Sequence, residues 1–141
     1  MVVDGLIWSR TVAKVSAAGS VIWSSDESYP AAMAARNDSV AGAKWIGLDA
    51  DENVFLGGSF QGTLTAGPVT LASAGDFDAY VRVLDPSSGH TKAIGSFGGT
   101  GTDTLMALTV DASGNAVLVG VTGTSWGTSS TTQLFVAKLG F

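Results

Sequence analysis

The sequence predicts an all-β protein made of β-propeller-like blades, each an antiparallel sheet of four strands, in a propeller that is incomplete. Short apolar runs separated by turn residues recur along the whole chain, and two unrelated motifs return in the same order. Composition agrees, because glycine fills 19 of 141 positions and charged residues make up only 13%. The length fits one domain, 1–141, with its own core.

The expected strands are runs of three to six residues rich in Val, Ile, Phe, Trp and Tyr. Turn residues cluster between them at Asp49–Asn53, Asp85–Gly89 and Asp111–Asn115, where Gly and Asn accept positive φ and Asp caps its own turn. In chain order the runs are Leu6–Trp8, Val12–Val15, Val21–Trp23, Lys44–Leu48, Val54–Leu56, Ala79–Leu84, Leu105–Val110, Ala116–Val121 and Leu134–Leu139.

Two motifs carry the repeat. Asp49–Gly58 returns as Asp111–Gly120, a spacing of 62 residues. The second motif returns at spacings of 69 and then 55, as Val12–Val15, Val81–Leu84 and Val136–Leu139. Gly19 and Gly89 occupy the turn after its first two copies. Unequal spacings indicate that loops carry insertions while strands keep their register, as in the blades of a propeller.

The repeat spacing divides the chain. We expect approximate repeats at 12–80 and 81–135, terminal strands at 6–15 and 134–139, and an insertion at 26–43. Within the insertion, Tyr29–Arg36 has Pro before several good helix formers, so we expect a short helix or a loop capping one end of a blade. A surface excursion and a dedicated partner contact are both open interpretations of it, because long loops often carry function.

Several pieces of the C-terminal half resemble a known family. They are Asp78–Gly89, Gly98-Gly99 followed by Asp103, Val110–Gly120 with Thr122, and Phe135–Leu139. In combination they resemble the SBBP-type β-propeller repeat over most of Phe77–Phe141. The earlier copy departs from the pattern, since Glu52 stands where the turn Gly belongs and no Gly-Gly pair precedes it. The resemblance implies a secreted or cell-surface propeller without agreed catalytic residues.

Composition excludes several classes of protein. Seven basic against twelve acidic residues give a net charge of −5, which disfavours nucleic-acid or anionic-lipid binding through a basic patch. The absence of cysteine excludes disulfides, thiolate zinc sites and cysteine nucleophiles. Uncharged stretches are interrupted by polar residues too often for a membrane span. Met1–Arg10 is not a secretory signal, so the sequence leaves the compartment unknown.

Two patterns resemble catalytic sites but lack essential parts. Gly123–Gly127 satisfies the G-x-S-x-G pattern of serine hydrolases around Ser125, yet the chain's single His, His90, lies upstream of it. Asp76 and Asp78 share a strand face, where two carboxylates are more often turn anchors than an acid–base pair. We predict that His90, Ser125 and these two aspartates do not converge, and that the protein is not an enzyme.

One motif resembles a calcium loop. Asp49, Asp51 and Asn53 begin like an EF-hand, but Val54 and Phe60 stand where that loop needs Gly and a bidentate Glu. A strand-connecting turn is the first interpretation, and a looser calcium site stays open as the alternative. A single His without Cys is also a poor start for a zinc site. We therefore assign no metal, cofactor-binding or catalytic residue.

The candidate interaction surface rests on large aromatic and apolar side chains. A small domain rarely hides four indoles, because each N–H needs a partner. Packing between blades is one interpretation, and contact with a sugar or a protein on a propeller face is the other. The candidate residues are Trp8, Trp23, Trp45, Trp126, Tyr29 and Met33.

The predicted function is that of a non-catalytic structural or protein-interaction module, a subunit or fragment of a larger assembly. Blades take about 40–50 residues and closed propellers have four or more of them, so this chain holds roughly two. With mean hydropathy of +0.33, the uncovered faces should dock on other protein subunits, either copies of the chain or different proteins. The alternative is a propeller surface that binds carbohydrate or another ligand.

Overall fold

The computed structural model describes residues 7–30, 42–123 and 132–141, and within these ranges it contains nine β-strands and no helix. All paired strands are antiparallel and form two sheets, so the predicted all-β class is confirmed. The strands are β1 (Ile7–Val15), β2 (Val21–Pro30), β3 (Gly42–Leu48), β4 (Val54–Ala66), β5 (Val69–Leu84), β6 (Thr91–Phe97), β7 (Thr102–Val110), β8 (Ala116–Gly123) and β9 (Thr132–Leu139).

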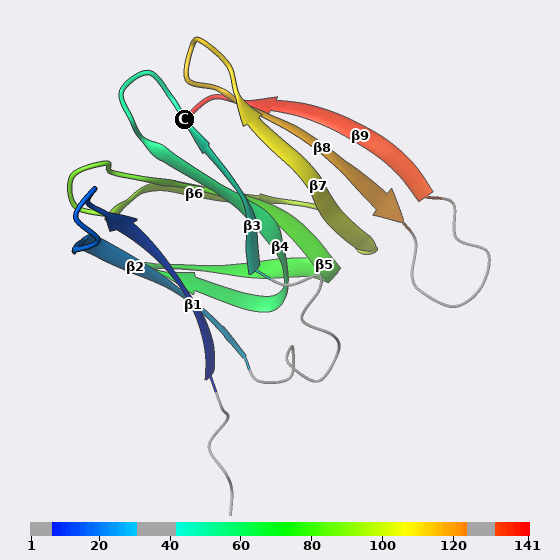
Figure 1. Ribbon diagram of the computed structural model, residues 1–141. Coiled ribbons are helices and arrows are strands. Elements are labelled where there is room, and N and C mark those ends of the chain that lie inside the picture. The colour runs from blue at the N-terminus through cyan, green and yellow to red at the C-terminus, as the bar shows by residue number, and fades with distance from the viewer. Residues whose placement is uncertain (1–6, 31–41, 124–131) are drawn as a thin grey trace, which may run out of the picture.

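Strands β3 to β6 form the central sheet, a meander in which each strand pairs with the next (Figure 1). Strands β4 and β5 extend beyond it as a hairpin, in which Thr63–Ala66 pairs with Val69–Ala72. Strand β2 joins this extension through one pair, Ser28 with Thr65, which makes the sheet six-stranded. The described residues form no closed ring of sheets.

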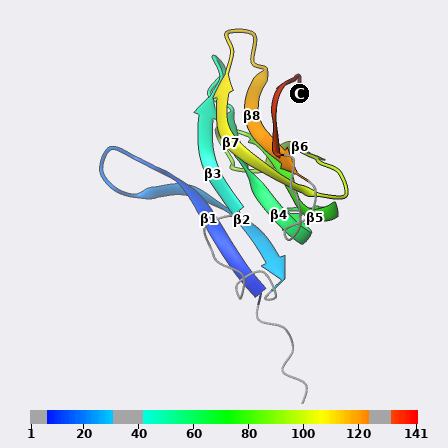
Figure 2. The ribbon, with the colours of Figure 1, turned by 90° about the vertical axis from the view of Figure 1, so that its right-hand side faces the viewer.

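The central sheet is covered on both faces. Strands β7–β9 lie on one side of it and the β1–β2 hairpin on the other (Figures 1 and 2). Alternation along β4 produces this, because Phe55 belongs to the apolar cluster shared with β7 and β8, whereas Val54 and Leu56 pack with Trp23 of β2. The core therefore consists of two layers, one on each face of β4 and β5.

The register of β7–β9 repeats that of β3–β5 residue by residue. Leu48 pairs with Val54 and Val110 pairs with Ala116, at an offset of 62. Both strand pairs also carry a bulge at the same position, at Lys44 and at Met106. The predicted equivalence of the turns at Asn53 and Asn115 is confirmed.

In the next strand pairs, β4 and β8 keep the offset of 62, while β5 and β9 correspond at an offset of 55. Gly57 pairs with Val81, and Val119 pairs with Val136. The predicted equivalence of Val81–Leu84 and Val136–Leu139 is confirmed.

The β1–β2 hairpin repeats the β5–β6 hairpin. Lys14 pairs with Trp23 as Val83 pairs with Ala93, and in both hairpins the register shifts before the next pair. The turns match too, because Gly19 and Gly89 have φ of 83° and 72°. The described residues thus contain one four-strand unit, β3–β6, preceded by the equivalents of its last two strands and followed by the equivalents of its first three.

The two ends of the predicted 26–43 insertion form strand. Residues 26–30 belong to β2 and Gly42 begins β3, while 31–41 lie outside the described residues. Polar residues continue β2 because Glu27 finds a buried partner in Arg82. Pro30 ends the strand, where its missing N–H is tolerated.

Candidate interaction surface

The interface between the central sheet and β7–β9 shows how one unit packs on the next. Its buried cluster consists of Phe55, Ala79, Val81, Val83, Leu105, Ala116 and Leu118. Gly57 permits close approach, because a Cβ there would lie 2.8 Å from Leu108 Cδ1. Leu108, Val110 and Leu139 pack against the same cluster from the side of β7 and β9.

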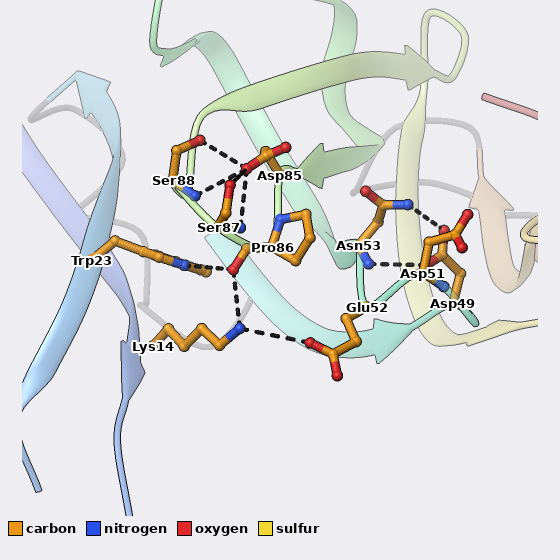
Figure 3. A network of polar contacts seen from close by, with 10 residues as sticks. All are labelled: Lys14, Trp23, Asp49, Asp51, Glu52, Asn53, Asp85, Pro86, Ser87 and Ser88. Carbon is orange, nitrogen blue, oxygen red and sulfur yellow. Dashed lines mark hydrogen bonds and ion pairs between the residues drawn. The ribbon is translucent and has the colours of Figure 1, made fainter.

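The interface with the β1–β2 hairpin adds polar contacts to apolar ones (Figure 3). The Pro86 carbonyl accepts hydrogen bonds from Trp23 Nε1 and from Lys14 Nζ, both at 3.0 Å. Lys14 Nζ also lies 3.8 Å from Glu52 Oε2. These contacts attach the hairpin to two turns of the central sheet, the one after β5 and the one before β4.

A buried ion pair crosses this second interface. The Arg82 guanidinium lies 3.6 Å from Glu27 Oε1, and both side chains are almost fully buried. Tyr80 Oη donates to Glu27 Oε2 at 2.6 Å, and Arg82 Nη2 donates to Ser25 Oγ at 2.7 Å. Strand β2 is therefore joined to β5 by charge as well as by apolar packing.

The turns before β4 and β8 are built in the same way by an aspartate. Asp49 Oδ1 accepts the N–H groups of Asp51 and Asn53, and the amide of Asn53 donates to Asp49 Oδ2 (Figure 3). Asp111 accepts the corresponding bonds in the later turn. The Asp49 oxygens thus serve the turn, and the described residues contain no group of three acidic or His side chains able to hold a metal ion.

The outer surface of β9 exposes two large apolar side chains, Leu134 and Val136, beside Lys138, which stands at the position of the buried Val83. Leu134 and Val136 occupy the positions of Ala79 and Val81 in the earlier unit, by the offset of 55. Ala79 and Val81 are 0% exposed beneath β7–β9, whereas Leu134 and Val136 are 75% and 74% exposed. We call Leu134 and Val136 the C-terminal face. It is the surface on which a following unit would pack.

Three further apolar side chains are exposed on β1 and β3, which belong to two successive units. Val15, Ile46 and Leu48 are 54%, 65% and 59% exposed. Their equivalents one or two units later are Leu139, Leu108 and Val110, which pack on the Phe55 cluster. We call Val15, Ile46 and Leu48 the N-terminal face. Its residues stand at positions that elsewhere contact the preceding unit.

Of the six predicted interaction residues, the structure describes the side chains of Trp23 and Trp45. Trp23 is buried between β2 and β4, which is the packing role. Trp45 is 37% exposed and donates Nε1–H to the Leu105 carbonyl at 3.4 Å. Trp8 and Tyr29 are paired backbone positions of β1 and β2. Trp126 and Met33 lie outside the described residues.

The residues of the two end faces are aliphatic and were not among the predicted interaction residues. Leu134 and Val136 could have been found by aligning the two copies of the second motif and extending the alignment back to Ala79. That alignment places two large apolar residues in the last copy where no further strand follows to cover them in the described residues.

His90, Asp76 and Asp78 have different surroundings in the structure. His90 lines an open polar hollow of about 640 Å³ between β2 and the β4–β5 hairpin, together with Ser25, Asp26 and Arg82. Asp76 instead accepts hydrogen bonds from Gln61 and Thr102, and Asp78 accepts the Ala74 N–H at 3.0 Å. Ser125 lies outside the described residues.

Comparison of the chain with protein-family models, curated proteins and solved structures gives no match. No helix of the described residues is long and apolar enough to cross a membrane.

Proposed function

We propose that the protein is a non-catalytic structural or protein-interaction module built from β-propeller-type repeats, and that it works within a larger assembly. The observation that carries this is the exposure of Leu134 and Val136 at positions that are buried in the preceding unit. The sequence resemblance to SBBP-type repeats supports the same proposal and favours a secreted or cell-surface location.

The driving force for docking is the apolar area of the two end faces. Full burial of a Leu, Val or Ile side chain contributes about 1.5–3 kcal/mol relative to leaving it in water. Five such side chains are more than half exposed at the two ends: Leu134, Val136, Val15, Ile46 and Leu48. Repeat units bury such faces only against neighbours, so a partner sheet is the natural cover.

The carbohydrate-binding alternative has weaker support. Sugar-binding sites offer the open face of an aromatic ring, but Trp23 is buried and its indole N–H already bonds the Pro86 carbonyl. Trp45 is 37% exposed, and its indole N–H already donates to the Leu105 carbonyl. A glycan-binding screen of the wild type and Trp45→Ala would support this alternative only if Trp45→Ala abolished binding.

The proposed function is tested by light scattering on the purified chain over a range of concentrations. We expect a mass above that of one chain, or aggregation, in the wild type. Leu134→Thr/Val136→Thr should shift the distribution toward single chains, because it removes apolar area and keeps β-propensity. The matched control, Ala72→Thr on the exposed β4–β5 hairpin, should behave as wild type. A stable single chain with a cooperative thermal transition in the wild type would contradict the proposal.

A further inference from the structure

Two buried aspartates come together where the loop between β6 and β7 begins. Asp78 of β5 and Asp103 of β7 are each 3% exposed. A Cβ on Gly98 would lie 2.5 Å from Asp78 Oδ1 and 3.0 Å from Asp103 Oδ2, so the two carboxylates border the same point of the chain. The pair therefore joins an acidic group of the central sheet to an acidic group of the following unit.

One oxygen of this pair makes no hydrogen bond. Asp78 Oδ2 accepts the Ala74 N–H at 3.0 Å, and Asp103 Oδ2 accepts the Gly99 N–H at 2.7 Å. Asp78 Oδ1 is buried and has no hydrogen-bond donor among the described residues. A buried carboxylate oxygen without a partner costs free energy, and a second carboxylate beside it adds repulsion. A cation or a proton at Asp78 Oδ1 removes both penalties.

We infer that Asp78 and Asp103 bind a calcium ion at the junction of the two units. Carboxylate oxygens favour hard cations such as calcium and magnesium over zinc or copper. Calcium accepts carboxylates, backbone carbonyls and water in flexible geometry, whereas magnesium keeps several waters, for which a pair this deeply buried leaves little room. The loop also brings carbonyl groups against the same part of β5, because a Cβ on Gly75 would lie 2.5 Å from the Gly99 oxygen.

This site differs from the acidic turn at Asp49, whose oxygens already accept the hydrogen bonds of that turn. Without a cation, the Asp78–Asp103 pair lowers its charge by binding a proton, which agrees with the raised pKa of Asp78. Protons and calcium therefore compete for the pair, and calcium should bind more weakly as pH falls. A bound ion ties β5 to β7, so calcium should stabilise the packing of one unit on the next.

The test is urea unfolding at pH 7 of the chelator-treated chain, with and without about 1 mM calcium chloride. We expect calcium to raise the urea midpoint of the wild type, and sodium chloride of equal ionic strength not to do so. Asp78→Asn and Asp103→Asn should lose this rise, because each removes a carboxylate ligand and keeps an acceptor for its backbone N–H. Asp51→Asn, on the exposed turn before β4, is the matched control and should keep the rise.

Calcium titration calorimetry on the folded wild type measures binding directly, and we expect one ion per chain, bound more weakly at pH 5 than at pH 7. A wild-type midpoint that does not respond to calcium, or that rises equally in sodium chloride, would overturn the inference. So would a rise that persists in Asp78→Asn, or one that disappears in Asp51→Asn. All samples are compared at one protein concentration, so the association of the end faces, and with it the proposed function, is tested separately.

Discussion

Glu52 and Gly114 occupy the same position in two equivalent turns, and both have a left-handed backbone, with φ of 62° and 77°. Glu52 is the only described residue other than glycine with positive φ. The turn fixes this conformation, because the N–H of Glu52 donates to the Asp49 carbonyl just as the N–H of Gly114 donates to the Asp111 carbonyl. The turn at Glu52 therefore has the same geometry as the turn at Gly114, without the glycine that favours a left-handed backbone.

We expect Glu52→Gly to stabilise the protein. A left-handed conformation costs an L-residue roughly 1–2 kcal/mol, and the extra freedom of glycine in the unfolded chain offsets part of that. The free energy of unfolding should rise by about 0.5–1 kcal/mol, measured by urea denaturation. The converse variant, Gly114→Ala, should lower it by about 1 kcal/mol. A loss of stability in Glu52→Gly would show that its 3.8 Å contact with Lys14 outweighs the backbone strain.

The two hairpin glycines should respond differently to alanine. A Cβ on Gly89 would lie 2.5 Å from Trp23 Cε3, whereas a Cβ on Gly19 would meet nothing within 4 Å. Both variants suffer the strain of positive φ, about 1 kcal/mol, but Gly89→Ala must also displace the Trp23 ring. We expect Gly89→Ala to cost about 1–3 kcal/mol more than Gly19→Ala in thermal or urea unfolding. Equal losses would contradict the packing of Trp23 on this turn.

Removing one charge of the buried Arg82–Glu27 pair should destabilise the protein more than removing both charges. Arg82→Met removes the guanidinium 3.6 Å from the buried Glu27 carboxylate, and should lower the free energy of unfolding by about 3–5 kcal/mol. Arg82→Met/Glu27→Gln removes both charges, so the double variant should be more stable than Arg82→Met alone. Chemical denaturation of the set measures the coupling. A double variant no more stable than the single one would contradict this account.

Two aspartates should respond to pH with opposite sign. Burial raises the pKa of Asp78, and the Asp103 carboxylate adds to the rise. Its stabilising contribution is therefore present when the carboxyl is protonated and is lost as pH rises through the folded-state pKa. Asp78→Asn, which keeps an acceptor for the Ala74 N–H, should unfold at higher urea than wild type at pH 7. The difference should vanish below the unfolded pKa of about 4.

Asp111 is the matched control for that experiment. The Lys138 ammonium and the hydrogen bonds from Asn115 hold the pKa of Asp111 well below its usual range. Its contribution is present above the unfolded pKa of about 4 and is lost as pH falls toward the folded value. Asp111→Asn should therefore lower stability at pH 7 and lose that effect in acid. The same sign for both variants at pH 7 would contradict these assignments.

Much of the fold could be predicted from short motifs. Asp49–Gly58 and Asp111–Gly120 carry the register of four strands, because turn residues and alternating apolar residues are local signals. The continuation of β2 through Asp26–Pro30 could not be predicted, since the burial of Glu27 depends on Tyr80 and Arg82, which lie 53 and 55 residues away in sequence. The long β4–β5 hairpin was missed because Gly62 and Gly67 interrupt its apolar pattern.

The existence of exposed apolar faces could be predicted from the sequence, but the residues that form them could not. Low charge and incomplete repeats indicate that apolar faces stay uncovered. Which residues of a strand point outward, however, depends on the register of its pairing, because a shift by one residue turns every side chain to the other face. Trp23 and Leu134 show this, because the larger residue is buried and the smaller one is exposed. Only the register identifies Leu134 as the counterpart of Ala79.

The measurement that tests the central claim most directly is the reactivity of a single cysteine on the C-terminal face. The chain has no cysteine, so Val136→Cys carries the one thiol, and Ala72→Cys on the exposed β4–β5 hairpin is its control. If the C-terminal face docks on another copy, the maleimide-labelling rate of Val136→Cys should fall as protein concentration rises, while that of Ala72→Cys stays constant. Labelling of Val136→Cys at the same rate at every concentration would contradict the claim.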